Sequence, residues 1–351
     1  MQPKWGIQGM AVAPHSLASQ SALAVLREGG NALEAMISAA ATIAVVYPHM
    51  NSIGGDSFWV IHAPGKAMGG IDACGAAAGL ATRTWYHEQG INGSIPFRGP
   101  IAANTVAGTI SGWGAAFTLS KKSLGGRLPL SRLLEDAIHY AENGVPVTHS
   151  QSALTEKKRA ELTPQPGFAD TFLVNGKAPA TGSVFLQKRL AATLRQITKK
   201  GTEDYYRGEL AEQIAKELKQ IGSPLRLDDL QRHRAKLINP LHLAHSVADV
   251  YNMTPPTQGV VSLMILGILD QLKLKQFVVD SPEYVHHCVE ATKQAFKVRD
   301  QYITDPAYMQ QQMTWMKQGL ATGMTQPKAV LQGFEQSIIS YVVQDPQQQQ
   351  K

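Results

Sequence analysis

The stretch that most constrains this fold is residues 29–79, where helical patterns, glycine turns and an apolar run follow one another closely. Gly29-Gly30 separates two helical patterns, and the second pattern is rich in alanine and ends at Pro48. A turn-rich loop over 51–56 precedes an apolar run that is typical of a buried strand. Because glycine lets a backbone turn tightly or approach another closely, this stretch predicts close packing in a layered domain.

The composition favours a large globular domain and argues against nucleic acid as a partner. The chain has 351 residues, of which 44% are hydrophobic and 17% charged, so it can bury a sizeable core. Its net charge of +6 is spread along the chain, and the densest clusters are Lys121-Lys122 and Lys199-Lys200. Because binding to phosphates needs clustered positive charge, we expect no nucleic-acid partner. An acidic small substrate or an acidic partner subunit stays open.

The two cysteines and the N-terminus bear on the compartment. Cys74 and Cys288 do not make a framework of disulfides, which suits a reducing compartment, although a single bridge stays open. The first residues carry no apolar signal core, and the longest nearly apolar run, 36–46, is too short to span a bilayer. We therefore expect a cytoplasmic protein without membrane association, or a periplasmic or secreted one if the N-terminus is already processed.

The remaining pattern predicts mostly helices in a single domain over 1–351, helix-rich over 129–235 and with a mobile tail over 345–351. Ser16 and Asn31 are the expected caps of the first two helices. The expected helices cover 17–28, 32–47, 108–121, 130–143, 150–163, 185–199, 208–220, 260–271 and 283–302, and the expected strands cover 57–63, 67–73, 241–245 and 247–253.

Motifs for metal or cofactor binding are not found. The sequence has no HExxH, no CxxC pair, no EF-hand loop and no glycine-rich phosphate loop, so no metal and no cofactor are expected. His286 and His287 point in different directions on a predicted helix, which favours surface or half-buried histidines. Cys74 stands out in a small-residue loop between strand and helix. The residues favour an inert buried thiol there, leave a pocket-lining role open, and give a nucleophilic cysteine little support.

Six motifs, in order and almost end to end, resemble the large subunit of the γ-glutamyltransferase (γ-glutamyl transpeptidase) family. Each motif is modest alone, but the shared order makes chance a poor explanation. The matching segments are GMAVA at 9–13 with His15 and LAS at 17–19, GGNALEA at 29–35, IGGDSF at 53–58, YRG at 206–208, PPTQG at 255–259 and EATKQAF at 290–296.

The resemblance implies an α/β, or α+β, N-terminal-nucleophile hydrolase fold, of which this chain is the large-subunit part of an αββα sandwich. In that family one precursor cleaves itself, and the freed N-terminal threonine of the small subunit is the nucleophile. The segment 341–346 resembles the end of a large subunit. We therefore expect no catalytic residue in this chain, a small subunit from the same precursor as partner, and a small-molecule amide as substrate. A dimer of heterodimers stays open.

One departure from the family concerns the substrate. Family members carry an arginine after the strand that matches 70–72, and its guanidinium binds the α-carboxylate of the γ-glutamyl group. Cys74 stands at that position and Gly75 follows, so both are expected to line the pocket. The function implied is cleavage of an amide and transfer of the acyl group to water or an amine. A divergent amidohydrolase acting on oxamate, cephalosporin or glutaryl amides is an alternative, and a non-catalytic binding protein with the same fold is a second.

Overall fold

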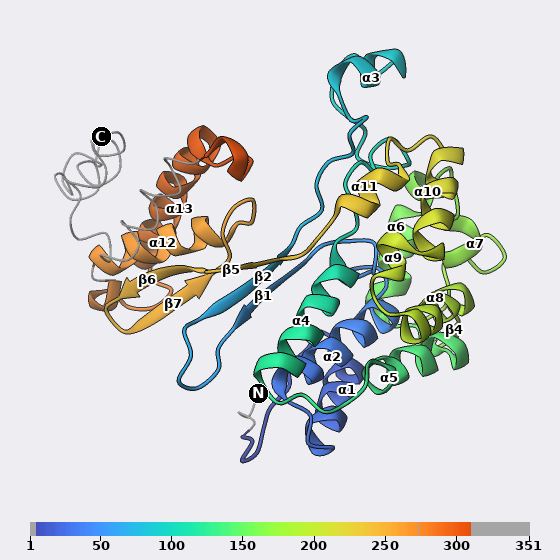
Figure 1. Ribbon diagram of the computed structural model, residues 1–351. Helices are drawn as coiled ribbons and strands as arrows, with labels where there is room; N and C mark the ends of the chain where they lie inside the picture. Colours follow the sequence, from blue (N-terminus) through green and yellow to red (C-terminus); the bar gives the residue numbers. More distant parts are fainter. Residues whose placement is uncertain (1–4, 273, 310–351) are drawn as a thin grey trace. The chain divides into compact units, whose positions relative to one another are not determined.

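The computed structural model describes residues 5–272 and 274–309, which form two compact units (Figure 1). Of the described residues, the first unit comprises 5–58 and Ile71–Leu237, and the second comprises Trp59–Gly70, 238–272 and 274–309. Each unit is thus assembled from segments that are distant in the sequence. The expected single domain over 1–351 stays a prediction, and the expected tail over 345–351 lies outside the described residues, as does the segment 341–346.

Helix α2 (Ala32–Val46) lies at the centre of the first unit and is buried on most of its surface. Its alanines let neighbouring helices approach closely, and α1 (Ser16–Arg27), α4 (Thr109–Ser123) and α5 (Leu130–Asn143) pack against it. Asn31 caps it as predicted, since its side chain accepts the Glu34 amide at 3.0 Å and the Glu34 carboxylate accepts the Asn31 amide at 3.0 Å.

The cap of the first helix was predicted at the wrong residue. Ser16 is already helical, and His15 is the cap, with extended backbone and Nδ1 accepting the Leu17 amide at 3.2 Å. An imidazole nitrogen can take the place of a hydroxyl here because capping needs only an acceptor within reach of the first turn.

Glu34 links the start of α2 to a second part of the first unit. Its carboxylate is fully buried, and besides Asn31 it accepts the backbone amide of Leu128 at 2.9 Å. Lys121 Nζ, on α4, lies 3.7 Å from the same oxygen. A buried carboxylate is stable only when its charge and lone pairs are satisfied in this way.

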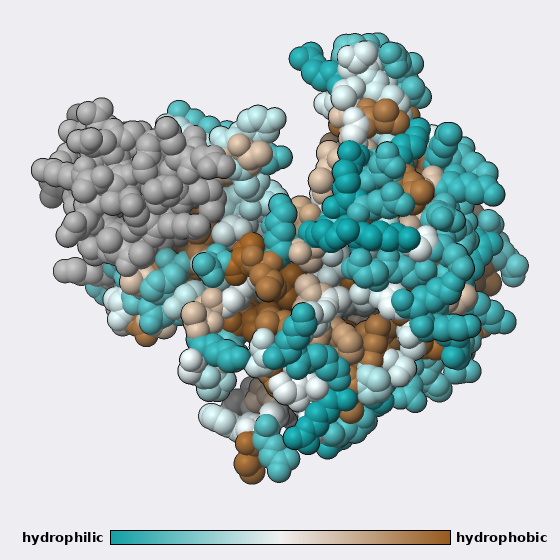
Figure 2. Space-filling model, viewed as in Figure 1, coloured by the Kyte–Doolittle hydropathy of each residue, from teal (hydrophilic) through white to brown (hydrophobic). Residues whose placement is uncertain are grey.

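The other helices of the first unit form its outer part, and the side of α8, α9 and α10 seen in Figure 2 is mostly hydrophilic. Helix α5 buries Leu133, Leu134 and Ala137, one face of the 3.6-residue period. These helices are α3 (Arg83–Glu88), α6 (His149–Leu162), α7 (Phe168–Phe172), α8 (Lys188–Lys200), α9 (Asp204–Arg207), α10 (Glu209–Gln220) and α11 (Leu227–Arg232).

The helix expected over 185–199 begins three residues late. Val184–Phe185 is instead a short strand, β4, paired antiparallel with β3 (Val145–Pro146). Phe185, the expected first residue of the helix, therefore belongs to a bridge between two loops, and α8 starts at Lys188.

Three strands form a small sheet in the order β1–β2–β5. They are β1 (Ser57–Ile61), β2 (Gly69–Ala73) and β5 (Lys236–Ile238), so the last strand joins a hairpin made much earlier in the chain. The hairpin was predicted at 57–63 and 67–73, and the turn takes a few more residues than expected. Within β2, Ile71 and Ala73 are fully buried.

The second unit packs two helices against a two-stranded hairpin. Strands β6 (Leu241–His245) and β7 (Ala248–Asn252) pair antiparallel, with Leu243 opposite Val250. The core joins β6 to α12 (Gly259–Gln271) and α13 (Pro282–Tyr302) through fully or nearly fully buried side chains. Two short 3-10 turns, Leu274–Gln276 and Pro306–Tyr308, complete the described part. Among the helices described, none is long and apolar enough to cross a membrane.

Candidate functional site

A loop over residues 74–79 leaves β2 and runs beside a second loop over 104–108. The amide of Val106 donates to the carbonyl of Ala76 at 3.0 Å, and the amide of Ala78 donates to the carbonyl of Asn104 at 2.8 Å. The Ala77–Thr105 pair between them forms an antiparallel bridge. Two irregular segments are thereby fixed as firmly as a short piece of sheet.

Gly75 is required by how closely these two loops approach. A Cβ at Gly75 would lie 1.6 Å from the carbonyl oxygen of Val106, a distance that no side chain can occupy. Gly108 has the same constraint, because a Cβ there would lie 1.8 Å from the carbonyl oxygen of Ala73. Both contacts are with backbone, so neither can be relieved by a side-chain rotation. The small-residue loop noted in the sequence therefore serves close backbone packing.

Two carboxylates hold the backbone at Cys74 and Gly75. Asp72 Oδ1 accepts the amide of Cys74 at 2.9 Å, and Asp56 Oδ1 accepts the amide of Gly75 at 2.9 Å. The second oxygen of Asp56, Oδ2, lies 3.7 Å from the Sγ of Cys74. Hydrogen bonds from amides to an ionised carboxylate are stronger than those between neutral groups. Asp56 thus both fixes the loop and places a negative charge beside the thiol.

The loop that carries Asp56 is anchored to the start of α4. The carbonyl of Gly55 accepts the amides of Gly108 and Thr109, each at 2.9 Å. The hydroxyl of Thr109 reaches the carbonyls of Gly55 at 2.8 Å and Asp56 at 3.1 Å. Three segments that are distant in the sequence therefore meet at one point, and the Asp56 carboxylate itself stays exposed.

Tyr206 and His233 form the buried floor next to these loops. The Tyr206 hydroxyl donates to the carbonyl of Ala107 at 2.8 Å and accepts the amide of Ser111 at 2.9 Å. Burial raises the pKa of Tyr206 well above its ordinary value, so this phenol acts as a neutral hydrogen-bonding group. Its ring centroid lies 5.1 Å from that of His233.

His233 is only 8% exposed, and its Nε2 is buried without a hydrogen-bond partner in the part of the chain that the structure describes. Burial lowers the pKa of His233, although the carboxylates of Asp56 and Asp72 act in the opposite direction. Its Cε1 lies 3.4 Å from the position of a Cβ on Gly108. A neutral imidazole therefore packs directly beneath the paired loops.

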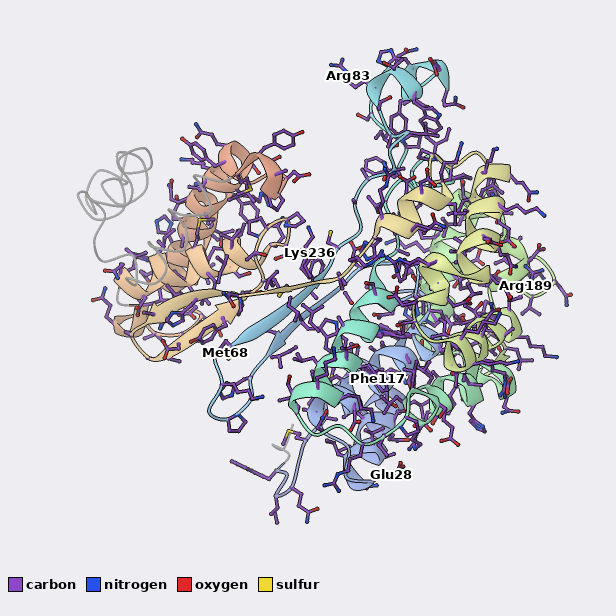
Figure 3. The ribbon with its side chains drawn as sticks, viewed as in Figure 1. Glu28, Met68, Arg83, Phe117, Arg189 and Lys236 are labelled. Carbon is purple, nitrogen blue, oxygen red and sulfur yellow. The ribbon has the colours of Figure 1, made fainter. Side chains whose placement is uncertain are left out.

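The far end of the 74–79 loop meets α11. Asp229 Oδ1 accepts the amide of Gly79 at 2.9 Å and lies 2.9 Å from Nη2 of Arg232, whose side chain is 71% exposed. Arg83, the first cation in the sequence after Cys74, belongs to α3, and Figure 3 shows it on a segment that projects away from the end of β2. Neither arginine stands in the stretch 74–78.

Of the residues singled out from the sequence, two lie in this loop and two lie on α13. Cys74 is half-buried and Gly75 is buried in the loop just described, whereas His286 is exposed and His287 half-buried on α13, as predicted. The Sγ of Cys74 lies 3.7 Å from Oδ2 of Asp56. In residues 5–272 and 274–309 no group of three or more histidine, cysteine or acidic side chains is placed to hold a metal.

The sequence reasoning gave no role to the groups that organise this loop: Asp56, Asp72, Tyr206, Asp229 and His233. Asp56 left the clearest signal, since it interrupts a loop that is glycine-rich in the family that the sequence resembles. Asp72 binds an amide only two residues along the chain, a local turn that an aspartate at this position could have indicated. Tyr206, Asp229 and His233 left no signal, because each acts on a segment far from it in the chain.

Comparison with known proteins agrees with the motifs. The family model described as gamma-glutamyltranspeptidase matches residues 18–336. An oxamate amidohydrolase proenzyme of Klebsiella pneumoniae is 55% identical over 301 residues, which are 86% of this chain and 56% of that protein. A glutathione hydrolase-like YwrD proenzyme of Bacillus subtilis is 40% identical over 304 residues, again 86% of this chain and 56% of the relative.

A solved structure matches over a larger share of its own chain. The gamma-glutamyltranspeptidase of Helicobacter pylori is similar with a TM-score of 0.82 and 28% identity, and the match covers 94% of this chain and 95% of that one. The chain spans about half the length of the two curated relatives. The fold is the N-terminal-nucleophile hydrolase fold expected from the motifs. On these grounds the chain belongs to the γ-glutamyltranspeptidase family.

Proposed function

We propose that this chain is the large subunit of a self-processing amide hydrolase whose nucleophilic threonine lies on a small subunit cleaved from the same precursor. The observation that carries the proposal is the extent of the match: almost the whole of one solved family chain, but only 56% of each proenzyme. The remainder of such a proenzyme is where the family places the nucleophile. A threonine hydroxyl there attacks the amide carbon, the amine leaves with a proton, and water or an amine then takes the acyl group.

The role of this chain is to shape the pocket for the acyl donor. Cys74 and Gly75 line it at the position where family members carry the arginine for the γ-glutamyl carboxylate. A thiol cannot make the bidentate, charge-assisted contact of a guanidinium, which contributes about 1.5–3 kcal/mol. Within the family we therefore favour a divergent amidohydrolase, and the 55% identity to an oxamate amidohydrolase proenzyme supports this choice. Hydrolysis or transfer of γ-glutamyl groups, as in glutathione hydrolase, is the second candidate.

The test is an amidase screen on the two-chain enzyme, obtained by expressing the precursor and letting it cleave itself. Glutathione, a γ-glutamyl anilide, a glutaryl amide and oxamate are compared by kcat/KM, with the small subunit's N-terminal threonine replaced by alanine as control. We expect oxamate or another donor without the amino-acid head to be preferred. Preference for the γ-glutamyl compounds would reverse the choice between the two candidates. A processed protein that cleaves none of these amides would instead support a binding protein that keeps the fold.

A further inference from the structure

Two departures from the family pattern lie together in space. Asp56 interrupts the glycine-rich loop, and Cys74 stands at the arginine position, yet they are far apart in the sequence. In the structure Asp56 Oδ2 lies 3.7 Å from Cys74 Sγ, and Asp56 Oδ1 holds the next residue, Gly75, through its amide. Where the family combines a glycine and an arginine, this chain combines a carboxylate and a thiol. The local charge therefore differs by two units, one lost with the arginine and one added with the aspartate.

Within residues 5–272 and 274–309, the carboxylates of Asp56 and Asp72 and the ammonium of Lys236 all act on the pKa of His233, so one lysine faces two carboxylates there. Asp72 adds a second carboxylate, which binds the Cys74 amide. The guanidinium of Arg232 is paired with Asp229 at the far end of the loop. The guanidinium of Arg207 is bonded to Glu203 and to the carbonyl of His233. His233 is buried in the floor beneath the paired loops.

We propose that Asp56 is a specificity-determining residue that makes the Cys74 side of the acyl-donor pocket anionic and rejects donors with a carboxylate at that point. This inference rests on the proposed function, because it assigns the substrate class of the same pocket. The Asp56–Cys74 pair is called the anionic wall below.

The substrate class follows from where a donor carries its charge. In a γ-glutamyl donor the α-carboxylate lies several bonds from the scissile carbonyl and would face the anionic wall, with like charges close together. In oxamate the carboxylate is bonded to the scissile carbonyl itself and does not extend to a remote wall. The anionic wall therefore selects amides of short acyl groups, or of acyl groups whose far end carries no carboxylate.

The anionic wall also explains why C74R alone is not expected to restore the contact with a γ-glutamyl carboxylate. An arginine placed at residue 74 would lie within reach of Asp56 and pair with it, so its guanidinium would not be available to a substrate carboxylate. Removing the Asp56 charge is needed as well. The effects of the two substitutions are consequently non-additive.

The first experiment measures the charge at the wall without relying on activity. Cys74 and Cys288 are the only cysteines of the chain, so alkylation of each by iodoacetamide, which is neutral, and by iodoacetate, which is anionic, is followed by mass spectrometry. In D56N the amide oxygen still accepts the Gly75 amide, but the charge is gone. We expect the iodoacetate-to-iodoacetamide rate ratio at Cys74 to rise about three- to tenfold in D56N at low salt and to change less at high salt.

Controls separate this effect from a general one. The ratio at Cys288, on α13, is expected to stay within twofold, and so is the ratio at Cys74 in D170N, which removes an exposed aspartate from α7. An unchanged ratio at Cys74 in D56N overturns the proposal. This readout holds even if the enzyme cleaves none of the amides screened, so the failure of the inference is distinguishable from the failure of the proposed function.

The second experiment measures selectivity. The ratio of kcat/KM for a γ-glutamyl anilide to that for a short-chain amide is determined for wild type, C74R, D56N and C74R/D56N, with self-cleavage and melting temperature recorded for each. We expect C74R alone to change the ratio by less than threefold and the double variant to raise it at least tenfold. A full gain from C74R alone would overturn the proposal. R232Q is included because a loss of γ-glutamyl activity there, with no effect of D56N, would assign the carboxylate contact to Arg232 instead.

Discussion

Replacing Gly75 by alanine tests whether the two paired loops are held as closely as the structure indicates. A Cβ at Gly75 would lie 1.6 Å from the Val106 carbonyl oxygen, so the loops must separate by more than 1 Å to reach ordinary contact, roughly 3.2 Å. That movement breaks two backbone hydrogen bonds between the loops and the bond from the Gly75 amide to Asp56. At about 0.5–1.5 kcal/mol for each neutral bond and about 1.5–3 for the charged one, the loss is about 2.5–6 kcal/mol.

Gly79→Ala is the matched control in the same loop. A Cβ there meets Asp229 Oδ1 at 3.5 Å and Arg232 Nη2 at 3.6 Å, which is ordinary contact, and the backbone is not left-handed. We expect Gly75→Ala to lower the melting temperature of the two-chain protein by roughly 5–10 °C and to reduce amide turnover. Gly79→Ala should stay within about 2 °C of wild type. Equal melting temperatures for the two variants would refute the close approach of the two loops at Gly75.

Three further predictions concern single side chains. Glu34→Ala leaves two part-buried backbone amides without their acceptor and should lower the free energy of unfolding in urea by about 2–5 kcal/mol, whereas a loss below 1 kcal/mol would contradict its role. Cys74→Ala should leave kcat within a few-fold, because no charge is lost, and a drop of several orders of magnitude would make the thiol catalytic. Burial lowers the pKa of His233 in the folded protein, so its contribution to stability is present above the ordinary value of about 6.5 and is lost as pH falls toward the folded-state pKa. The pKa values of His15 and His49 are lowered as well, so part of the pH dependence should remain when His233 is replaced. His233→Gln should reduce the change in the free energy of unfolding between pH 7 and 5 by up to about 1.4 kcal/mol per pH unit. An unchanged pH dependence would show that this imidazole takes no part.

The features that could be predicted from the sequence depend on neighbours a few residues away. The capping box at Asn31 and Glu34 is readable because both of its hydrogen bonds close within one turn. Helix α5 is readable because its buried leucines repeat with the helical period. The end of α2 before Pro48 is readable because proline cannot continue a helix.

The features that could not be predicted depend on contacts across the chain. The sequence located Cys74 and Gly75 through a family motif, but the meeting of Asp56 with both needs the hairpin and the start of α4 to be in place. The buried position of His233 depends on Gly108 and Tyr206 in the same way. The start of α8 was misplaced because the strand pairing of Phe185 with Val145 outweighs the local helical pattern at residue 185.

The order of the strands in the chain affects when the nascent protein can complete its three-stranded sheet during synthesis on the ribosome. The hairpin of β1 and β2 leaves the exit tunnel early, but the third strand of its sheet, β5, follows only after residues 74–235 have been made. Until then the free edge of β2 is an unpaired strand in a nascent chain, which favours association with other strands. A truncated gene that ends before residue 236 would leave that edge open permanently. Such fragments are expected to need chaperones, whereas fragments that extend past β5 are not.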